Sequence, residues 1–181
     1  MDNTLTIFVC GTYRDLAKER KEILEAIRKL RYSHDSMEYF GARNTRAIDT
    51  CLEEVRKSDI LVVLVGYMYG NLVPELGISY SEAEYQEAYR LGKPCLVYFR
   101  SEDVPILPKF KEDDPNKVEQ LRHFKDTLRN RYTIGNFRNS HDLSVSVTAD
   151  LSRIAYNLKN TGNGSGDPKD IIRLGVEEWN I

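Results

Sequence analysis

Cysteine is scarce in this sequence, there is a single tryptophan, and no apolar run approaches the length of a membrane-spanning helix. The three scattered cysteines, Cys10, Cys51 and Cys95, are too few for a disulfide framework or a zinc site. We expect them to be buried, reduced thiols in a cytoplasmic protein. A membrane span needs about 18 consecutive apolar residues, so none is predicted. The amino-terminal stretch lacks a basic segment, and we expect no signal peptide.

The charge balance excludes a further class of protein. Lysine and arginine number 26 against 28 aspartates and glutamates, which gives a formal net charge of −2. A protein that binds nucleic acid regardless of sequence needs a basic surface, so we expect no nucleic-acid partner. The three histidines are far apart and lack ligand spacing, so the sequence predicts no metal site and no bound cofactor.

The sequence does contain a regular alternation of apolar runs and amphipathic helical patterns. Predicted strands cover 5–11, 35–42, 59–67, 95–99 and 131–137, and predicted helices cover 14–30, 47–58, 77–94, 115–131 and 143–158. This rhythm indicates an α/β fold with a parallel sheet covered by helices on both faces. The simplest arrangement is the flavodoxin-like strand order 2-1-3-4-5. We expect one domain over residues 1–160, then a flexible linker and a short helix or arm over 161–181.

Two loops mark the expected binding site, because open α/β sheets bind ligands where neighbouring connections diverge at the carboxyl ends of strands. The first loop is "CGTYRD" and the second is "GYMYGN". Backbone amides of the first are suited to a phosphate, and tyrosine rings of the second are suited to stacking on a base or nicotinamide. The candidate binding residues are Gly11, Thr12, Tyr13, Arg14, Gly66, Tyr67, Tyr69 and Ser81.

Simpler interpretations of these loops stay open. Asp15 or Thr12 can cap the following helix, Arg14 can be a solvated charge, and the tyrosines can merely roof the core. No complete glycine-rich nucleotide fingerprint is present to decide between them. The charged helix at 115–131 is interpreted as a solvated face.

The predicted helix "GISYSEAEYQEAYRLGKP" begins at the same edge and carries three glutamates. Residues two positions apart point to nearly opposite sides of a helix, so Glu82 and Glu84 cannot both face the crevice. Glu84 shares a stripe with Ala88 and Leu91, which predicts that it lies on the inward face and opens into the crevice. The competing interpretation is that Glu84 only caps the helix, with Ser81 as the N-cap residue.

The other two glutamates of this helix, Glu82 and Glu87, are expected to be solvated or capping carboxylates. Glu82 shares the more exposed side of the helix with Gln86 and Tyr89. Glu84 is therefore the candidate catalytic residue.

Three blocks, "IFVCGTYRDLAKERKEILEAI", "MEYFGARNTRAIDTCLEEVRKSDILVVLVGYMYG" and the helix quoted above, resemble a TIR-like domain of unknown function. Such domains often precede NACHT-type or other STAND NTPases, and the resemblance covers about residues 5–155. In TIR domains that cleave NAD+, the catalytic glutamate stands nine residues before the lysine of a Gly-Lys pair, with an alanine four residues after it. Glu84, Ala88 and Lys93 reproduce that spacing.

The resemblance implies an NAD+ glycohydrolase or cyclase that releases nicotinamide and forms ADP-ribose or a cyclic isomer. It also implies a homo-oligomer, a signal in bacterial antiphage defence, and a nucleotide-sensing effector or STAND NTPase as partner. Two alternatives remain open: a non-catalytic TIR-type module for self-association or adaptor binding, and an N-glycosidase like the nucleoside deoxyribosyltransferases, which have a related fold.

Overall fold

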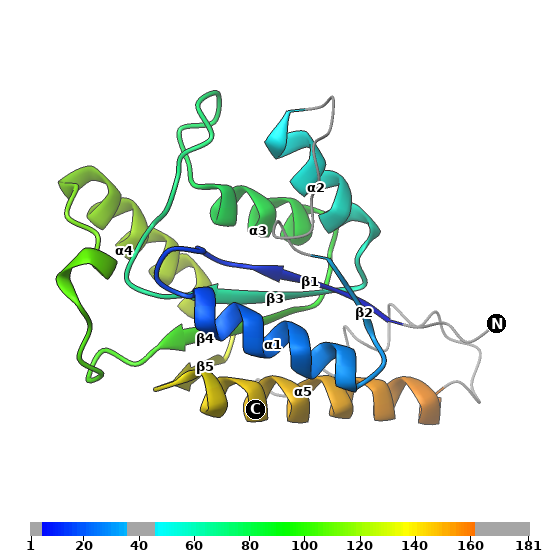
Figure 1. The fold of residues 1–181 in the computed structure, drawn as a ribbon. Coiled ribbons are helices and arrows are strands. Elements are labelled where there is room, and N and C mark those ends of the chain that lie inside the picture. The colour runs from blue at the N-terminus through cyan, green and yellow to red at the C-terminus, as the bar shows by residue number, and fades with distance from the viewer. Residues whose placement is uncertain (1–4, 36–45, 162–181) are drawn as a thin grey trace.

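The computed structural model describes residues 5–35 and 46–161, which form one parallel sheet with helices on both sides (Figure 1). The strands are β1 (Thr6–Cys10), β2 (Ser33–Asp35), β3 (Ile60–Val65), β4 (Cys95–Arg100) and β5 (Ile134–Phe137). The helices are α1 (Ala17–Lys29), α2 (Ala47–Lys57), α3 (Tyr80–Arg90), η2 (Pro108–Phe110), α4 (Pro115–Arg129) and α5 (Ser140–Thr161). The strand order is β2-β1-β3-β4-β5 and every pairing is parallel, which confirms the predicted flavodoxin-like arrangement.

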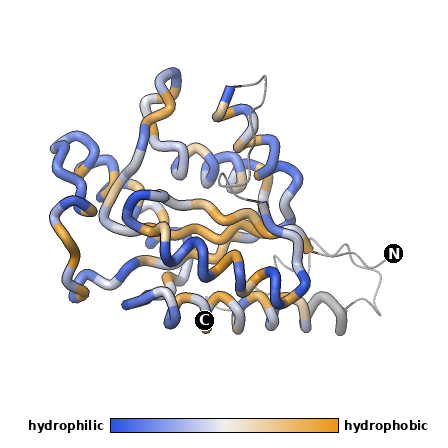
Figure 2. The backbone as a smooth tube through the Cα atoms, viewed as in Figure 1, coloured by the Kyte–Doolittle hydropathy of each residue, from blue (hydrophilic) through white to orange (hydrophobic). Residues whose placement is uncertain are grey.

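The sheet separates two apolar cores. Helices α1 and α5 cover one face, and α2, α3 and α4 cover the other (Figure 1). Strand β3 lies in the middle of the sheet and all six of its residues are buried. A continuously apolar strand is what a position covered on both faces requires, and Figure 2 shows this apolar band through the centre of the molecule.

Local signals explain where the helices begin. Asp114 caps α4 by accepting the backbone amides of Asn116 and Lys117, and Pro115 occupies the first turn, where its missing N–H costs nothing. Ser79 caps α3 through the amide of Glu82. Helix α1 begins after Leu16 with no side-chain cap, so the interpretation of Asp15 or Thr12 as its cap is wrong.

Several boundaries differ from the predicted ones. The second strand lies at Ser33–Asp35, and most of the predicted segment 35–42 falls outside the described residues. The predicted linker and arm over 161–181 also fall outside them, apart from Thr161 at the end of α5. In the described part of the chain, no helix combines the length and apolar character needed to cross a bilayer.

The interpretation of the charged helix α4 as a solvated face is wrong for one of its sides. Leu121, Phe124 and Leu128 pack into the core on the α3 side of the sheet. Lys125 is buried along with them. The exposed side carries the ion pairs of Arg122 with Glu119 and Asp126.

Candidate functional site

The carboxyl ends of β1 and β3 are joined by a buried carboxylate, that of Asp15. It accepts the backbone amides of Tyr67 at 2.8 Å and Met68 at 3.1 Å, and it also accepts the hydroxyl of Thr12. Gly66 makes room for it, because a Cβ atom there would lie 2.2 Å from an Asp15 carboxylate oxygen. Asp15 therefore ties the two predicted binding loops together from the inside.

The contact with Asp15 limits which groups of the second loop can bind a ligand. Two of its backbone amides already donate to an internal anion, so they are not available to an incoming phosphate. Burial raises the pKa of Asp15, against the opposing effect of its hydrogen bonds with Thr12, Tyr67 and Met68. Because the Asp15 carboxylate accepts two backbone amides and a hydroxyl of its own fold, it is a structural element of this edge of the sheet.

The first loop places its candidate residues in different environments. Tyr13 is 64% exposed and Arg14 is exposed beside it, so both lie free of the core. Gly11 has a φ of +150°, and a Cβ atom there would lie 2.7 Å from the Leu64 carbonyl oxygen. The Gly11 carbonyl accepts a 2.7 Å hydrogen bond from the guanidinium of the buried Arg20.

The two tyrosines of the second loop have structural contacts. Tyr69 is 2% exposed, its hydroxyl donates to Glu82 at 2.6 Å, and its amide donates to Glu112 at 3.1 Å. Tyr69 thus packs into the core and covers its edge, as in the simpler interpretation. Tyr67 is half-buried and its hydroxyl donates to the Ser101 carbonyl at 2.6 Å, which fixes the ring at the sheet edge.

The cap of α3 decides between the two interpretations of Glu84. Ser79 is the N-cap residue and Glu82 stands three positions later, so the capping pair is Ser79 and Glu82. The interpretation of Glu84 as the partner of a Ser81 cap is wrong. Ser81 lies inside the helix, and its carbonyl accepts the Cys10 thiol at 3.2 Å.

Glu84 lies on the inward face of α3, as the helical spacing predicts, with Ala88 buried one turn later. The stripe does not extend to Leu91, which is the C-cap residue and is exposed. The expectation that Glu84 opens into the crevice is wrong, because the residue is only 3% exposed. The helix presses this carboxylate against β1 and α2.

Thiols from those two elements surround the Glu84 carboxylate. Burial is the largest of the causes that raise the pKa of Cys10. The charge of Glu84 and a hydrogen bond with Glu84 raise this pKa further. The same causes raise the pKa of Cys51 to about 12, so both thiols are neutral beside Glu84. The positive charge of Arg20 acts on both thiols in the opposite direction. All three cysteines are free and buried, as expected.

The remaining glutamates of α3 have structural roles. Glu82 accepts from Tyr69 and, at 3.2 Å, from Gln86. Glu87 is buried and pairs with Arg56 of α2 at 2.6 Å and with Arg90 at 2.7 Å. Hydrogen bonds from Arg90 and Arg56 lower the pKa of Glu87 to about 2. The expectation of a solvated or capping Glu87 is therefore wrong.

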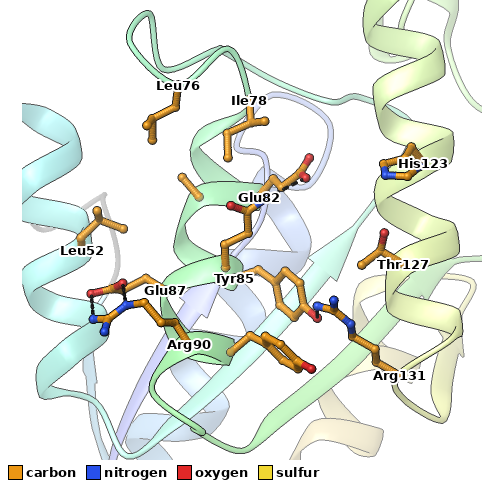
Figure 3. A pocket seen from close by; sticks show the side chains of 13 residues that line it. Leu52, Leu76, Ile78, Glu82, Tyr85, Glu87, Arg90, His123, Thr127 and Arg131 are labelled. Atoms are coloured by element: carbon orange, nitrogen blue, oxygen red, sulfur yellow. Dashed lines mark hydrogen bonds and ion pairs between the residues drawn. The ribbon is translucent and has the colours of Figure 1, made fainter.

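A surface groove of about 720 Å³ lies over the outer face of α3 (Figure 3). Leu52 of α2 stands on one side and His123 and Thr127 of α4 stand on the other. Arg131 donates to the Tyr85 hydroxyl at 3.0 Å and stacks 4.0 Å from the centre of the Tyr89 ring. Glu84 does not line this groove, so the groove and the carboxylate belong to opposite sides of α3.

Sequence reasoning missed Asp15 as a link between loops, Glu87 as a link between helices, and the buried position of Lys125. Each depends on a partner distant along the chain: Asp15 meets Tyr67, Glu87 meets Arg56, and Lys125 meets the rings of Tyr67 and Phe99. For Lys125, the sequence did offer a signal of burial: this lysine directly follows Phe124, which belongs to an apolar series at helical spacing.

The fold and this edge define an open, doubly wound α/β domain with a buried carboxylate at the point where the first and third strands diverge. A family model described as a domain of unknown function (DUF4062) matches residues 6–152. The chain belongs to this DUF4062 family. A comparison with curated proteins gives no match.

Proposed function

We propose that this domain is a TIR-like enzyme that cleaves the bond between nicotinamide and ribose in NAD+, with Glu84 as the catalytic carboxylate. The observation that supports this proposal best is the N-cap of α3, where the Ser79 hydroxyl accepts the backbone amide of Glu82. Since Ser79 and Glu82 form the cap, capping does not account for the deeply buried Glu84. Burying a carboxylate is unfavourable, and such groups are concentrated at functional sites.

The chemistry requires a negative charge near C1′ of the ribose. As the C1′–N bond breaks, its electron pair leaves with the nicotinamide and positive charge develops on the sugar ring. A carboxylate in a water-poor site stabilises that charge strongly. Water then adds at C1′ and releases its proton, which gives ADP-ribose; attack by a group of the same ADP-ribosyl unit gives a cyclic isomer instead.

The neighbours of Glu84 suit this role. Burial and the charge of Glu84 raise the pKa of both Cys10 and Cys51, so these neighbouring thiols are neutral and add no charge beside the carboxylate. The buried Arg20 belongs to the same cluster, because its positive charge acts on both thiols and lowers their pKa. The match of Glu84, Ala88 and Lys93 to the spacing of NAD-cleaving TIR domains supports the same assignment.

The burial of Glu84 has a consequence for how such an enzyme is controlled. A dinucleotide reaches a residue that is 3% exposed only after neighbouring side chains move. We therefore propose that the single chain is a resting state and that self-association opens the site. In this account the product is a signal in antiphage defence, read by an effector protein or passed to a STAND NTPase.

A direct test is to incubate purified protein with NAD+ and, separately, with deoxynucleosides and an acceptor base, and to follow release of the free base by chromatography. Nicotinamide release from NAD+ alone supports the proposal. Base release from deoxynucleosides alone assigns the protein to the deoxyribosyltransferase-like class. Release from neither, at protein concentrations at which the chain self-associates, contradicts both enzyme assignments.

A second candidate function, that of a non-catalytic association module, is favoured by the groove over α3. Leu76 and Tyr89 of its lining are each about half exposed, and the lining mixes these apolar groups with charged ones. Mixed apolar and charged surfaces with exposed aromatic residues are typical of protein interfaces. If Tyr89→Ala and Leu76→Ala disrupt self-association in a protein that has no NAD+ cleavage, this second function is supported.

A further inference from the structure

Lys125 of α4 is an unusual lysine because it is buried and has no counter-ion. Its residue is only 8% exposed. Among the residues that the structure describes, no hydrogen bond and no carboxylate at ion-pair distance satisfies its ammonium group. Instead, the nitrogen lies 5.7 Å from the centre of the Tyr67 ring and 5.7 Å from that of Phe99. A buried cation normally has a paired anion.

A second cation lies at the same place. The guanidinium of Arg129, one turn further along α4, lies 5.3 Å from the Phe99 ring. Arg129 pairs with Asp126 of the same helix at 3.1 Å and more loosely with Glu102, which is 3.9 Å away and has a side chain that is 76% exposed. The ion pair with Glu102 is long and exposed, so it contributes little. Two cations therefore meet at one aromatic ring, and only Arg129 of the two has carboxylates at ion-pair distance, Asp126 on its own helix and the weakly held Glu102.

The pKa of Lys125 reflects both its burial and the charges around it. Burial lowers the pKa of Lys125, and the neighbouring charge of Arg129 lowers it as well. Glu102 and Asp15 act in the opposite direction. Asp15 is already committed to the amides of Tyr67 and Met68, so Glu102 is the group that an incoming anion would replace.

The position of these groups is where ligands bind in such folds. Tyr67 follows the end of β3, and Phe99 is the residue before the last of β4. We propose that Lys125 and Arg129 form an oxyanion-binding site that takes the phosphate groups of a phosphorylated ligand, with the rings of Tyr67 and Phe99 as its apolar wall. This site is separate from Glu84 and does not depend on the proposed NAD+ cleavage.

The test is calorimetric titration of the whole chain with inorganic pyrophosphate at constant ionic strength. Wild-type protein is expected to bind one pyrophosphate, and Lys125→Met is expected to weaken binding by about tenfold or more, because it removes a charge-assisted contact. Lys109→Met is the matched control, since Lys109 also lies over a phenylalanine ring, at 4.9 Å, but is exposed. It is expected to leave the affinity unchanged.

Two further measurements test the proposal even if the Lys125→Met protein fails to fold. Glu102→Gln removes the competing carboxylate from the exposed rim and is expected to tighten pyrophosphate binding. Titration with ADP and with adenosine separates the sources of the phosphate: tighter binding of ADP than of pyrophosphate indicates a nucleotide, and equal binding indicates phosphate alone. No pyrophosphate binding by the wild type, or a Lys125→Met protein that binds as tightly as Lys109→Met, overturns the proposal.

Discussion

At the scale of single residues, some charged side chains that are usually found on protein surfaces are buried in this molecule, among them Asp15 and Glu84. Asp15 was considered as a helix cap, yet it accepts amides from a loop 52 positions away. Helical spacing selects Glu84 over Glu82 correctly as the inward residue, because only one of the two can face the sheet. It does not reveal how deeply Glu84 is buried, since the covering thiols come from β1 and α2.

Asp15→Ala should destabilise the protein by about 2–4 kcal/mol, because two backbone amides and the Thr12 hydroxyl lose their acceptor in a buried place. Denaturant unfolding of the two proteins measures this difference. Arg14→Ala is the neighbouring control and should stay within about 0.5 kcal/mol of wild type, since Arg14 is exposed. Equal stability of the two variants would show that Asp15 does not hold the loops together.

At the scale of elements, α2 and α3 are tied by Glu87. Its folded pKa of about 2 lies below the ordinary 4.5, so its ionised form stabilises the fold. That stability is fully present above about pH 4.5 and is lost as the pH falls toward 2. Arg56 and Arg90 are half exposed, so we expect a contribution of about 1–3 kcal/mol after screening.

The corresponding test compares wild type with Glu87→Gln in urea at several pH values. The wild type should be more stable at pH 6 and its advantage should fall progressively below about pH 4.5. Glu53→Gln on α2 is a suitable control, because its side chain is 55% exposed and its ion pair with Lys57 stays within one helix. A stability difference that is independent of pH would mean that the Arg56–Glu87 pair does not link the helices energetically.

The succession of elements was predictable because each carries its own local signal. The apolar run of β3 and the periodic patterns of α1 and α2 depend only on neighbours in sequence. The described residues of the edge strand β2, Ser33–Asp35, begin before the predicted segment 35–42 and are polar, so no apolar run in the sequence marks where this strand begins.

At the scale of the whole molecule, the proposed activity depends on assembly. Because Glu84 is 3% exposed in the single chain, the specific rate of nicotinamide release should rise with protein concentration. Activity assays run beside sedimentation velocity at the same concentrations measure both quantities. A constant specific activity in a protein that sedimentation shows to be monomeric would rule out control by self-association.

The measurement that tests the central claim most directly is nicotinamide release from NAD+ by wild type, Glu84→Gln and Glu82→Gln under identical conditions. The two variants change the same chemical group on the same helix, but Glu84 faces β1 and α2 whereas Glu82 meets Tyr69 and Gln86. We predict that Glu84→Gln abolishes cleavage while retaining the fold by circular dichroism, and that Glu82→Gln stays near wild type. Full activity of a folded Glu84→Gln protein would contradict the assignment of Glu84 as the catalytic residue.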